Sequence, residues 1–184
     1  FVDRARELRF PALAITDHGN MFGVIEFYEA CMKKGIKPII GIEAYLASGS
    51  RFEKTAAGHR EHTYHLTLLV KNETGYRNLM KLSSLAYTEG FYYRPRMDKE
   101  LLREYHEGLI CLSGCLASEL ARLVIDDQRE KAAECVHEYQ EIFGEDNYFL
   151  EIHNHNLKDQ AVIRNVYKEL SKKTGTRIVA ANDC

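Results

Sequence analysis

The sequence lacks several features that mark common classes of protein. No apolar run approaches the ~20 residues that cross a bilayer, and no signal-peptide pattern opens the chain. The formal net charge is -2, so the chain as a whole has no basic excess, and any contact with DNA would need a local patch. Neither a P-loop nor a Gly-x-Gly-x-x-Gly motif after a strand is present. We therefore expect neither a membrane protein nor a common nucleotide-binding fold.

Cysteines are few and scattered. There are 5, none of them in a Cys-x-x-Cys pair, and they are Cys31, Cys111, Cys115, Cys135 and Cys184. An odd number at irregular spacing does not suit a disulfide framework in a chain of this size. Because the sequence has no Cys-x-x-Cys pair, we do not expect a structural zinc knuckle. We expect a reducing, cytoplasmic location.

The length of 184 residues is enough for one domain with a real core. The hydrophobic content of 45% and the charged content of 28% are ordinary for a globular protein, and we take residues 1–184 as a single domain. The chain has no initiating Met, begins within a helical pattern and stops at the tip of a buried strand. We interpret it as a fragment of a longer protein, truncated at both ends, with a sheet edge left open by any missing strand.

Helical and strand patterns alternate along the chain. The helical patterns cover residues 2–8, 22–34, 76–87, 117–125, 131–143 and 160–173, and the strand patterns cover 13–17, 38–46, 64–70, 108–113, 148–152 and 178–183. This alternation predicts an α/β fold of parallel βαβ units. Several strand patterns are apolar throughout, as in sheets covered on both faces, and a closed or nearly closed barrel accounts for them best. Residues 47–61 are polar and predict a long exposed loop.

Potential metal ligands stand inside these strand patterns or at their ends. His18 follows the first pattern, and Glu43 lies inside an apolar one, where a carboxylate is costly unless it is paired or bound to a cation. The others are Cys115, His153, His155 and Asp183. α/β folds place their sites at the carboxyl ends of strands, and a mixed nitrogen and oxygen ligand set favours zinc or manganese.

Each of these residues also has an ordinary interpretation. Glu43 could pair with a buried cation, Cys115 could be a small core residue, and Asp183 could cap a following helix. The metal-site hypothesis rests on the expectation that these residues lie together at one end of the barrel, which we call the rim. His65 does not follow from this logic, because it lies near the start of its strand pattern and is expected at the opposite rim.

Six motifs together point to a family. They are ITDHGN (15–20), GIKPIIGIEAY (35–45), HLTLLV (65–70), NETGYRNL (72–79), LSGCL (112–116) and AND (181–183). With these motifs, essentially the whole chain resembles the PHP (polymerase and histidinol phosphatase) domain at the amino-terminal end of the bacterial DNA polymerase III alpha subunit.

The resemblance implies a distorted seven-stranded (β/α) barrel that holds up to three divalent metal ions, zinc or manganese. Carried over position by position, the implied ligands are His18, Glu43, His65, Cys115 and Asp183. His155 is a looser candidate, and Asp17 would orient its neighbours or cap the following helix. Two parts of the family pattern are absent: the first strand with its His-x-His motif, and the His of the final Asp-x-His motif.

The implied function is that of a replicative DNA polymerase whose polymerising chemistry lies in later domains, so the fragment alone is not expected to polymerise. Metals in this domain would support phosphodiester hydrolysis, interpreted as a 3′-5′ proofreading exonuclease. One alternative is a structural domain that stabilises the polymerase and docks a proofreading exonuclease subunit. Another is a free-standing phosphoesterase acting on a small phosphate monoester. The implied partners are DNA, the other polymerase domains and, through those domains, a sliding clamp; no membrane is involved.

The segment 91–96 (FYYRPR) interleaves aromatic residues with arginines. Arg94 and Arg96 are therefore candidates for binding nucleic acid, since this mixture suits stacking on bases and pairing with phosphates. An inter-domain contact or an ordinary loop is the alternative. The polar loop at 47–61 also carries basic side chains that could lie over the site or contact the DNA backbone.

Overall fold

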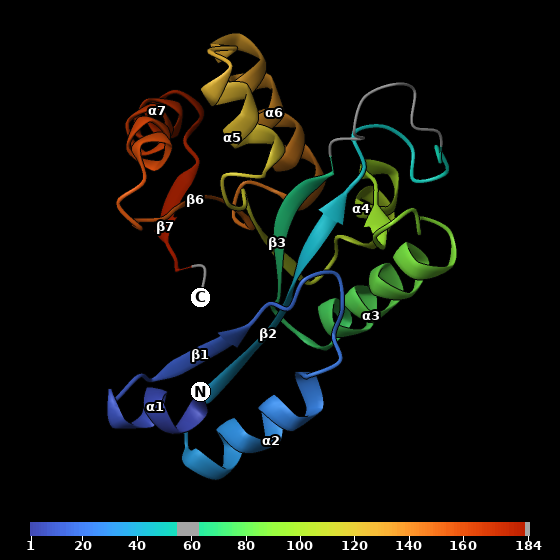
Figure 1. Ribbon diagram of the computed structural model, residues 1–184, viewed down its shortest axis with the longest axis vertical. Coiled ribbons are helices and arrows are strands. Elements are labelled where there is room, and N and C mark those ends of the chain that lie inside the picture. The colour runs from blue at the N-terminus through green and yellow to red at the C-terminus, as the bar shows by residue number, and fades with distance from the viewer. Residues whose placement is uncertain (55–62, 183–184) are drawn as a thin grey trace.

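The computed structural model describes residues 1–54 and 63–182, which form seven helices and seven strands (Figure 1). The helices are α1 (Val2–Glu7), α2 (Val24–Lys34), α3 (Glu73–Thr88), α4 (Lys99–Tyr105), α5 (Glu119–Ile125), α6 (Arg129–Phe143) and α7 (Lys158–Thr174). The strands are β1 (Ala12–Ile15), β2 (Lys37–Leu46), β3 (Tyr64–Val70), β4 (Arg96–Met97), β5 (Leu109–Leu112), β6 (Tyr148–Ile152) and β7 (Arg177–Ala180). The α/β class is confirmed.

The strands form one curled sheet, a half-barrel with the order β1-β2-β3-β5-β6-β7 and with β4 paired to β2 (Figure 1). β1 runs parallel to β2, and β5, β6 and β7 run parallel to one another. β3 is antiparallel to both of its neighbours, β2 and β5. This corrects the expectation of parallel βαβ units throughout. The connection from β2 to β3 has no helical pattern in its sequence, and a parallel pair needs a crossover whereas an antiparallel pair does not.

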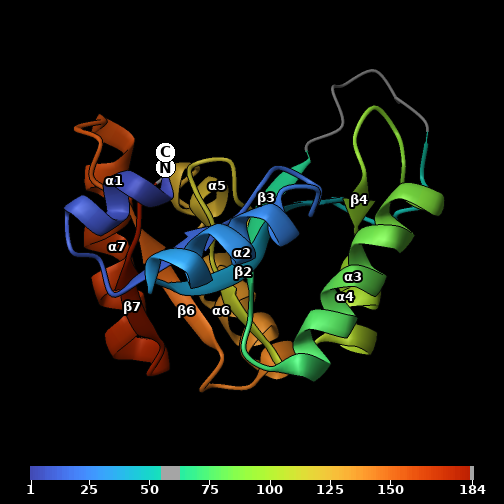
Figure 2. The ribbon, with the colours of Figure 1, turned by 90° about the horizontal axis from the view of Figure 1, so that it is seen from below.

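The helices cover the half-barrel in groups (Figure 1, Figure 2). α1 and α2 lie against the β1–β2 pair, α3 and α4 lie beside β3, and α5, α6 and α7 cover the β5–β7 end. The main core joins β2, β3, β5 and β6 to helices α3 to α7, with residues such as Leu68, Leu79 and Val136 fully buried. A smaller cluster, centred on Phe27 and Cys31, fixes α1 and α2 to β1. This packing fixes the strand ends at the rim.

Helix ends follow local sequence signals. Gly35, with φ 70°, ends α2 as the sequence predicts. α3 begins at Glu73, earlier than the predicted 76, because the Asn72 side chain accepts a hydrogen bond from the Gly75 N–H. The Asp98 side chain caps α4 in the same way. The sequence interpretation missed α4 and β4, because both are too short to show a periodic pattern.

No helix among residues 1–54 and 63–182 combines the length and the apolar character needed to cross a membrane.

Candidate metal centre

Three side chains from three different strand regions meet at one rim of the half-barrel. They are His18, just after β1, Glu43 in β2 and His65 in β3, and one ligand atom from each lies within 4.8 Å of the others. His18 reaches the rim because its backbone continues the parallel pairing past β1, as an isolated bridge to Glu43. The Glu43 N–H donates to the Asp17 carbonyl, and the Gly19 N–H donates to the Glu43 carbonyl. The turn that carries His18 is therefore tied to the backbone of Glu43.

The antiparallel direction of β3 explains the position of His65. Tyr45, near the end of β2, pairs with His65, near the start of β3. The first residues of β3 therefore lie at the same rim as the last residues of β2. The expectation that His65 lies at the opposite rim is wrong, because it assumed a parallel strand.

The distances within the cluster are short. The Glu43 Oε1 atom lies 2.6 Å from His65 Nδ1, and Oε2 lies 3.6 Å from His18 Nδ1. Cys115, in the turn after β5, brings its Sγ atom to 3.6 Å from both Glu43 Oε1 and His65 Nδ1. Four of the five ligand candidates from the sequence therefore converge. The fifth, Asp183, lies outside the described residues.

Glu43 is an anion that faces ring nitrogens and a thiol. The residue is 9% exposed, and burial opposes its ionisation. The hydrogen bond from His65 and the charges of His18 and His65 outweigh burial, so they lower the pKa of the Glu43 carboxyl from its ordinary value. A carboxylate oxygen, two imidazoles and a thiol are all ligands that zinc accepts, and manganese shares the preference for the carboxylate, so this donor set fits a divalent metal.

Tyr45 forms one wall of the cluster. Its ring stacks on His18 at 6.0 Å between centroids and meets His65 edge-on at 5.2 Å. The Arg94 guanidinium lies over the same ring, 4.7 Å from its centroid. Tyr45 was not selected from the sequence, because an aromatic residue in an apolar strand is typical of an ordinary core. The structure therefore adds an aromatic wall and an exposed arginine to the cluster.

Arg96 differs from Arg94 and corrects the sequence interpretation. It is 0% exposed, and its guanidinium donates to the backbone carbonyls of Gly90, Arg51 and Glu53. A buried guanidinium with these partners is not available to a phosphate. Arg96 instead ties the 91–96 segment to the start of the β2–β3 connection. The Arg51 side chain in that connection is also buried, paired with Asp98.

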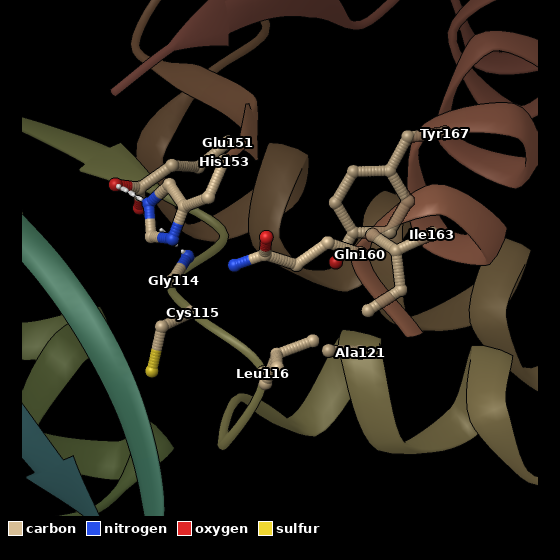
Figure 3. Close-up of a pocket in the computed structure, with 9 residues that line it drawn as sticks. All are labelled: Gly114, Cys115, Leu116, Ala121, Glu151, His153, Gln160, Ile163 and Tyr167. Atoms are coloured by element: carbon tan, nitrogen blue, oxygen red, sulfur yellow. Dashed lines mark hydrogen bonds and ion pairs between the residues drawn. The ribbon is translucent and has the colours of Figure 1, made fainter. Parts of the chain in front are cut away.

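Behind the turn that carries Cys115 lies a small pocket of about 10 Å³, about the size of one water molecule (Figure 3). Glu151 and His153 line it, and the Glu151 Oε1 atom lies 3.0 Å from His153 Nε2. His155, the looser ligand candidate, is not in the group of atoms around Glu43 and contacts Gln160 instead. The sequence interpretation noted His153 but missed Glu151. The signal was present, since Glu151 is a carboxylate inside an apolar strand, like Glu43.

Comparison with known proteins identifies the family. The model of the PHP domain matches residues 1–155, and the chain belongs to the PHP domain family. The resemblance inferred from the six motifs is thereby confirmed.

Curated relatives narrow the resemblance to one kind of protein. The chain is 48% identical to the DNA polymerase III subunit alpha of Treponema pallidum over 99% of the chain. It is 50% identical to that of Thermus aquaticus over 94% of the chain, and 46% identical to that of Deinococcus radiodurans over 94%. The chain spans only 16%, 14% and 13% of the length of these relatives.

A solved structure supports the fold. A Bifidobacterium adolescentis protein, described as a candidate metal-dependent phosphoesterase, matches with a TM-score of 0.53 and 14% sequence identity. The match covers 99% of this chain and 80% of that protein. At this identity the likeness shows the shared fold alone.

Proposed function

We propose that this chain is the PHP domain of a bacterial replicative DNA polymerase and that it hydrolyses phosphodiester bonds with divalent metals, as a 3′-5′ exonuclease. The convergence of His18, Glu43, His65 and Cys115 at one rim carries the proposal. Similarity to polymerase III alpha subunits over nearly the whole chain supports the assignment to a polymerase. Polymerisation itself would reside in other domains of the protein.

In this proposal the four residues at the rim hold the metals, with Asp183 as a fifth ligand. Divalent zinc or manganese, up to three ions, would neutralise phosphate charge and acidify water. Glu43 supplies a buried negative charge, and the Cys115 thiol would supply a second one on losing its proton to bind metal, whereas imidazoles bind metal as neutral ligands. Tyr45 holds the His18 ring by stacking, so a side chain that is 56% exposed keeps a defined orientation at the rim.

Arg94 is the proposed contact for the DNA backbone. It is exposed, it lies over Tyr45, and Tyr45 contacts both histidines of the cluster. Stacking on an aromatic ring leaves the guanidinium N–H groups free to bind a phosphate that lies in the plane of the guanidinium. Arg94 therefore suits the phosphate of a DNA end that enters the metal centre.

The proposed partners are DNA and the remaining polymerase domains, with a proofreading exonuclease subunit and a sliding clamp bound through other parts of the protein. The proposed location is the cytoplasm, which suits free cysteines such as Cys31 and Cys111.

The test compares His18→Ala with His137→Ala in the full-length protein. His137 is an exposed imidazole on α6 and serves as the control. We expect His18→Ala to lower manganese- or zinc-dependent 3′-5′ hydrolysis of labelled single-stranded DNA by about 100-fold or more, because even the neighbours of metal ligands typically cost 10–100-fold. Primer extension should be retained in both variants.

Two outcomes contradict the proposal. If purified His18→Ala keeps the hydrolytic rate, the nuclease site lies elsewhere. If metal removal lowers the melting temperature of the wild type but not its hydrolytic rate, the metals have a structural role.

Arg94→Ala tests the DNA contact. Loss of one charge-assisted hydrogen bond of about 1.5 kcal/mol should raise KM for single-stranded DNA about tenfold, with little change in kcat. The salt dependence of KM should also become weaker, because one phosphate contact is lost. Arg129→Ala, which removes an arginine paired with Asp127 at the start of α6, is the control. An unchanged KM in Arg94→Ala would rule this contact out.

A further inference from the structure

Glu151 is the second glutamate buried in the sheet. It lies in β6, is 7% exposed, and belongs to neither the ligand candidates of the sequence nor the cluster around Glu43. Its Oε2 atom accepts hydrogen bonds from the Gly114 N–H at 3.1 Å and from the Thr67 hydroxyl at 3.0 Å. Its Oε1 atom lies 3.0 Å from His153 Nε2 (Figure 3). Both oxygens of this carboxylate are thus engaged within the protein.

Both donors to Oε2 belong to segments that carry proposed metal ligands. Gly114 directly precedes Cys115 in the turn after β5. Thr67 lies two residues after His65 in β3, where it pairs in register with Glu43. One oxygen atom of Glu151 therefore joins the turn that presents the thiol to the strand that presents the imidazole.

Backbone hydrogen bonds also hold this turn: the Ser113 N–H donates to the Phe149 carbonyl at 2.9 Å, and the Ser118 N–H donates to the Cys115 carbonyl at 3.0 Å. Gly114 has φ 84°, and a Cβ at this position would lie 2.6 Å from the His65 carbonyl oxygen. The turn must therefore pass close to the backbone of His65 without a side chain of its own at position 114. The Ser113 side chain adds a second tie, because its Oγ atom accepts a hydrogen bond from the Glu151 N–H at 2.8 Å. Glu151 thus holds the turn through both its backbone and its carboxylate.

We infer that Glu151 is a positioning residue for the metal centre, which it serves by fixing the Ser113–Gly114–Cys115 turn so that the Cys115 thiol faces His65 and Glu43. This inference rests on the proposed metal centre. A buried carboxylate is costly, and here it is offset by donors from two ligand-bearing segments. A glutamine in its place is uncharged and has an NH2 group instead of the second oxygen, so the hydrogen bonds from Gly114 and Thr67 lose their charge assistance and a donor at His153 Nε2 loses its acceptor.

The experiment uses the full-length protein loaded with Co²⁺, because a cysteine thiolate bound to Co²⁺ gives a charge-transfer absorption that other ligands do not give. Cys115→Ser identifies the part of the spectrum that comes from Cys115. Glu151→Gln is compared with Glu138→Gln, the same substitution in an ion pair with Lys99 and Arg103, away from the cluster. Co²⁺ titration monitored at this band measures affinity, and melting without metal measures stability.

We expect Glu151→Gln to shift or weaken the Cys115 band and to lower Co²⁺ affinity by about 10–100-fold, the usual range for groups that orient metal ligands. Glu138→Gln should leave the band and the affinity unchanged. Thr67→Val removes one donor to the same oxygen and should shift the band less, so it replaces Glu151→Gln if that variant does not fold.

Two results overturn the inference in distinguishable ways. If the Cys115 band and the affinity are as in the wild type while melting without metal falls, Glu151 is only structural and the metal centre stands. If the wild type shows no band that depends on Cys115, the metal centre proposed for this rim falls and the role of Glu151 falls with it.

Discussion

Glu43 and Glu151 are both glutamates buried in the same sheet, 9% and 7% exposed, yet their surroundings differ in kind. Glu43 faces the ring nitrogens of two histidines and a thiol, all of which are potential metal ligands. Glu151 faces an amide N–H and a hydroxyl on one oxygen and an imidazole on the other. Burial of an acid is therefore not itself the mark of a metal ligand. A buried acid is a candidate metal ligand when the atoms around it, as around Glu43, can also donate lone pairs to a cation.

The largest expected difference between the two glutamates is in stability without metal. Glu151→Ala should lower the free energy of unfolding by about 3 kcal/mol, because it leaves buried donors such as the Gly114 N–H without an acceptor. Glu43→Ala should cost less, about 1 kcal/mol, because the main loss is the hydrogen bond with His65, while His18 is open to water and can be solvated instead. Native-state hydrogen exchange of peptides from β5 and β6 in the full-length protein measures both. Equal costs would erase the distinction.

When metal is added, substitution of Glu43 should cost more stability than substitution of Glu151, the reverse of the order without metal. At a metal concentration of about 100 times Kd, binding adds about 2.7 kcal/mol to the stability of the wild type. Glu43→Gln should abolish this gain at every manganese or zinc concentration, since it removes a ligand. Glu151→Gln should reduce the gain at low metal and recover it at high metal. Exchange protection of the β2 and β3 peptides across a metal titration reports both responses. A gain retained in Glu43→Gln would show that Glu43 is not a ligand.

The smallest expected effect concerns Glu138, a carboxylate that forms ion pairs with Lys99 and Arg103. Burial opposes ionisation of Glu138, but hydrogen bonds from Lys99 and Arg103 outweigh it and lower the pKa of this carboxyl from its usual 4.5. A lowered pKa in the folded state stabilises the protein above pH 4.5 and loses its effect as the pH falls through the folded-state value.

Thermal melting of the wild type should therefore decline more steeply below pH 4.5 than that of Glu138→Gln. Parallel curves for the two proteins would show that this ion pair contributes nothing measurable. The comparison of Glu43 with Glu151 would not be affected by that result.

Much of the fold could be predicted from the sequence because periodicity and helix caps are local. The strands at 64–70 and 148–152 have their predicted bounds, and Gly35 ends its helix as expected. The antiparallel direction of β3 was missed because the alternation of helices and strands elsewhere was extended to it, although the sequence between β2 and β3 shows no helical pattern for a parallel crossover. Because β3 runs antiparallel to β2, His65 pairs with Tyr45 and lies at the same rim as the end of β2.

The convergence of four candidate ligands could be anticipated by combining strand ends with the family resemblance. The difference between Arg94 and Arg96 could not, because the carbonyl partners of Arg96 at Arg51 and Glu53 come from about forty residues earlier in the chain. Tertiary partners of this kind have no local signal. Glu151 was within reach, since the argument that a carboxylate is costly in an apolar strand applies to it as much as to Glu43.

The pairing of β1, β2 and β3 has a consequence for the order in which the rim is assembled. His18, Glu43 and His65 all lie within a continuous stretch that ends with β3, whereas Cys115 follows two further helices and β5. Because synthesis proceeds from the amino end, the two imidazoles and the carboxylate leave the ribosome well before the thiol. A cation captured by the nascent chain would first meet nitrogen and oxygen alone. Sulfur would arrive last and shift the preference of the finished centre toward zinc.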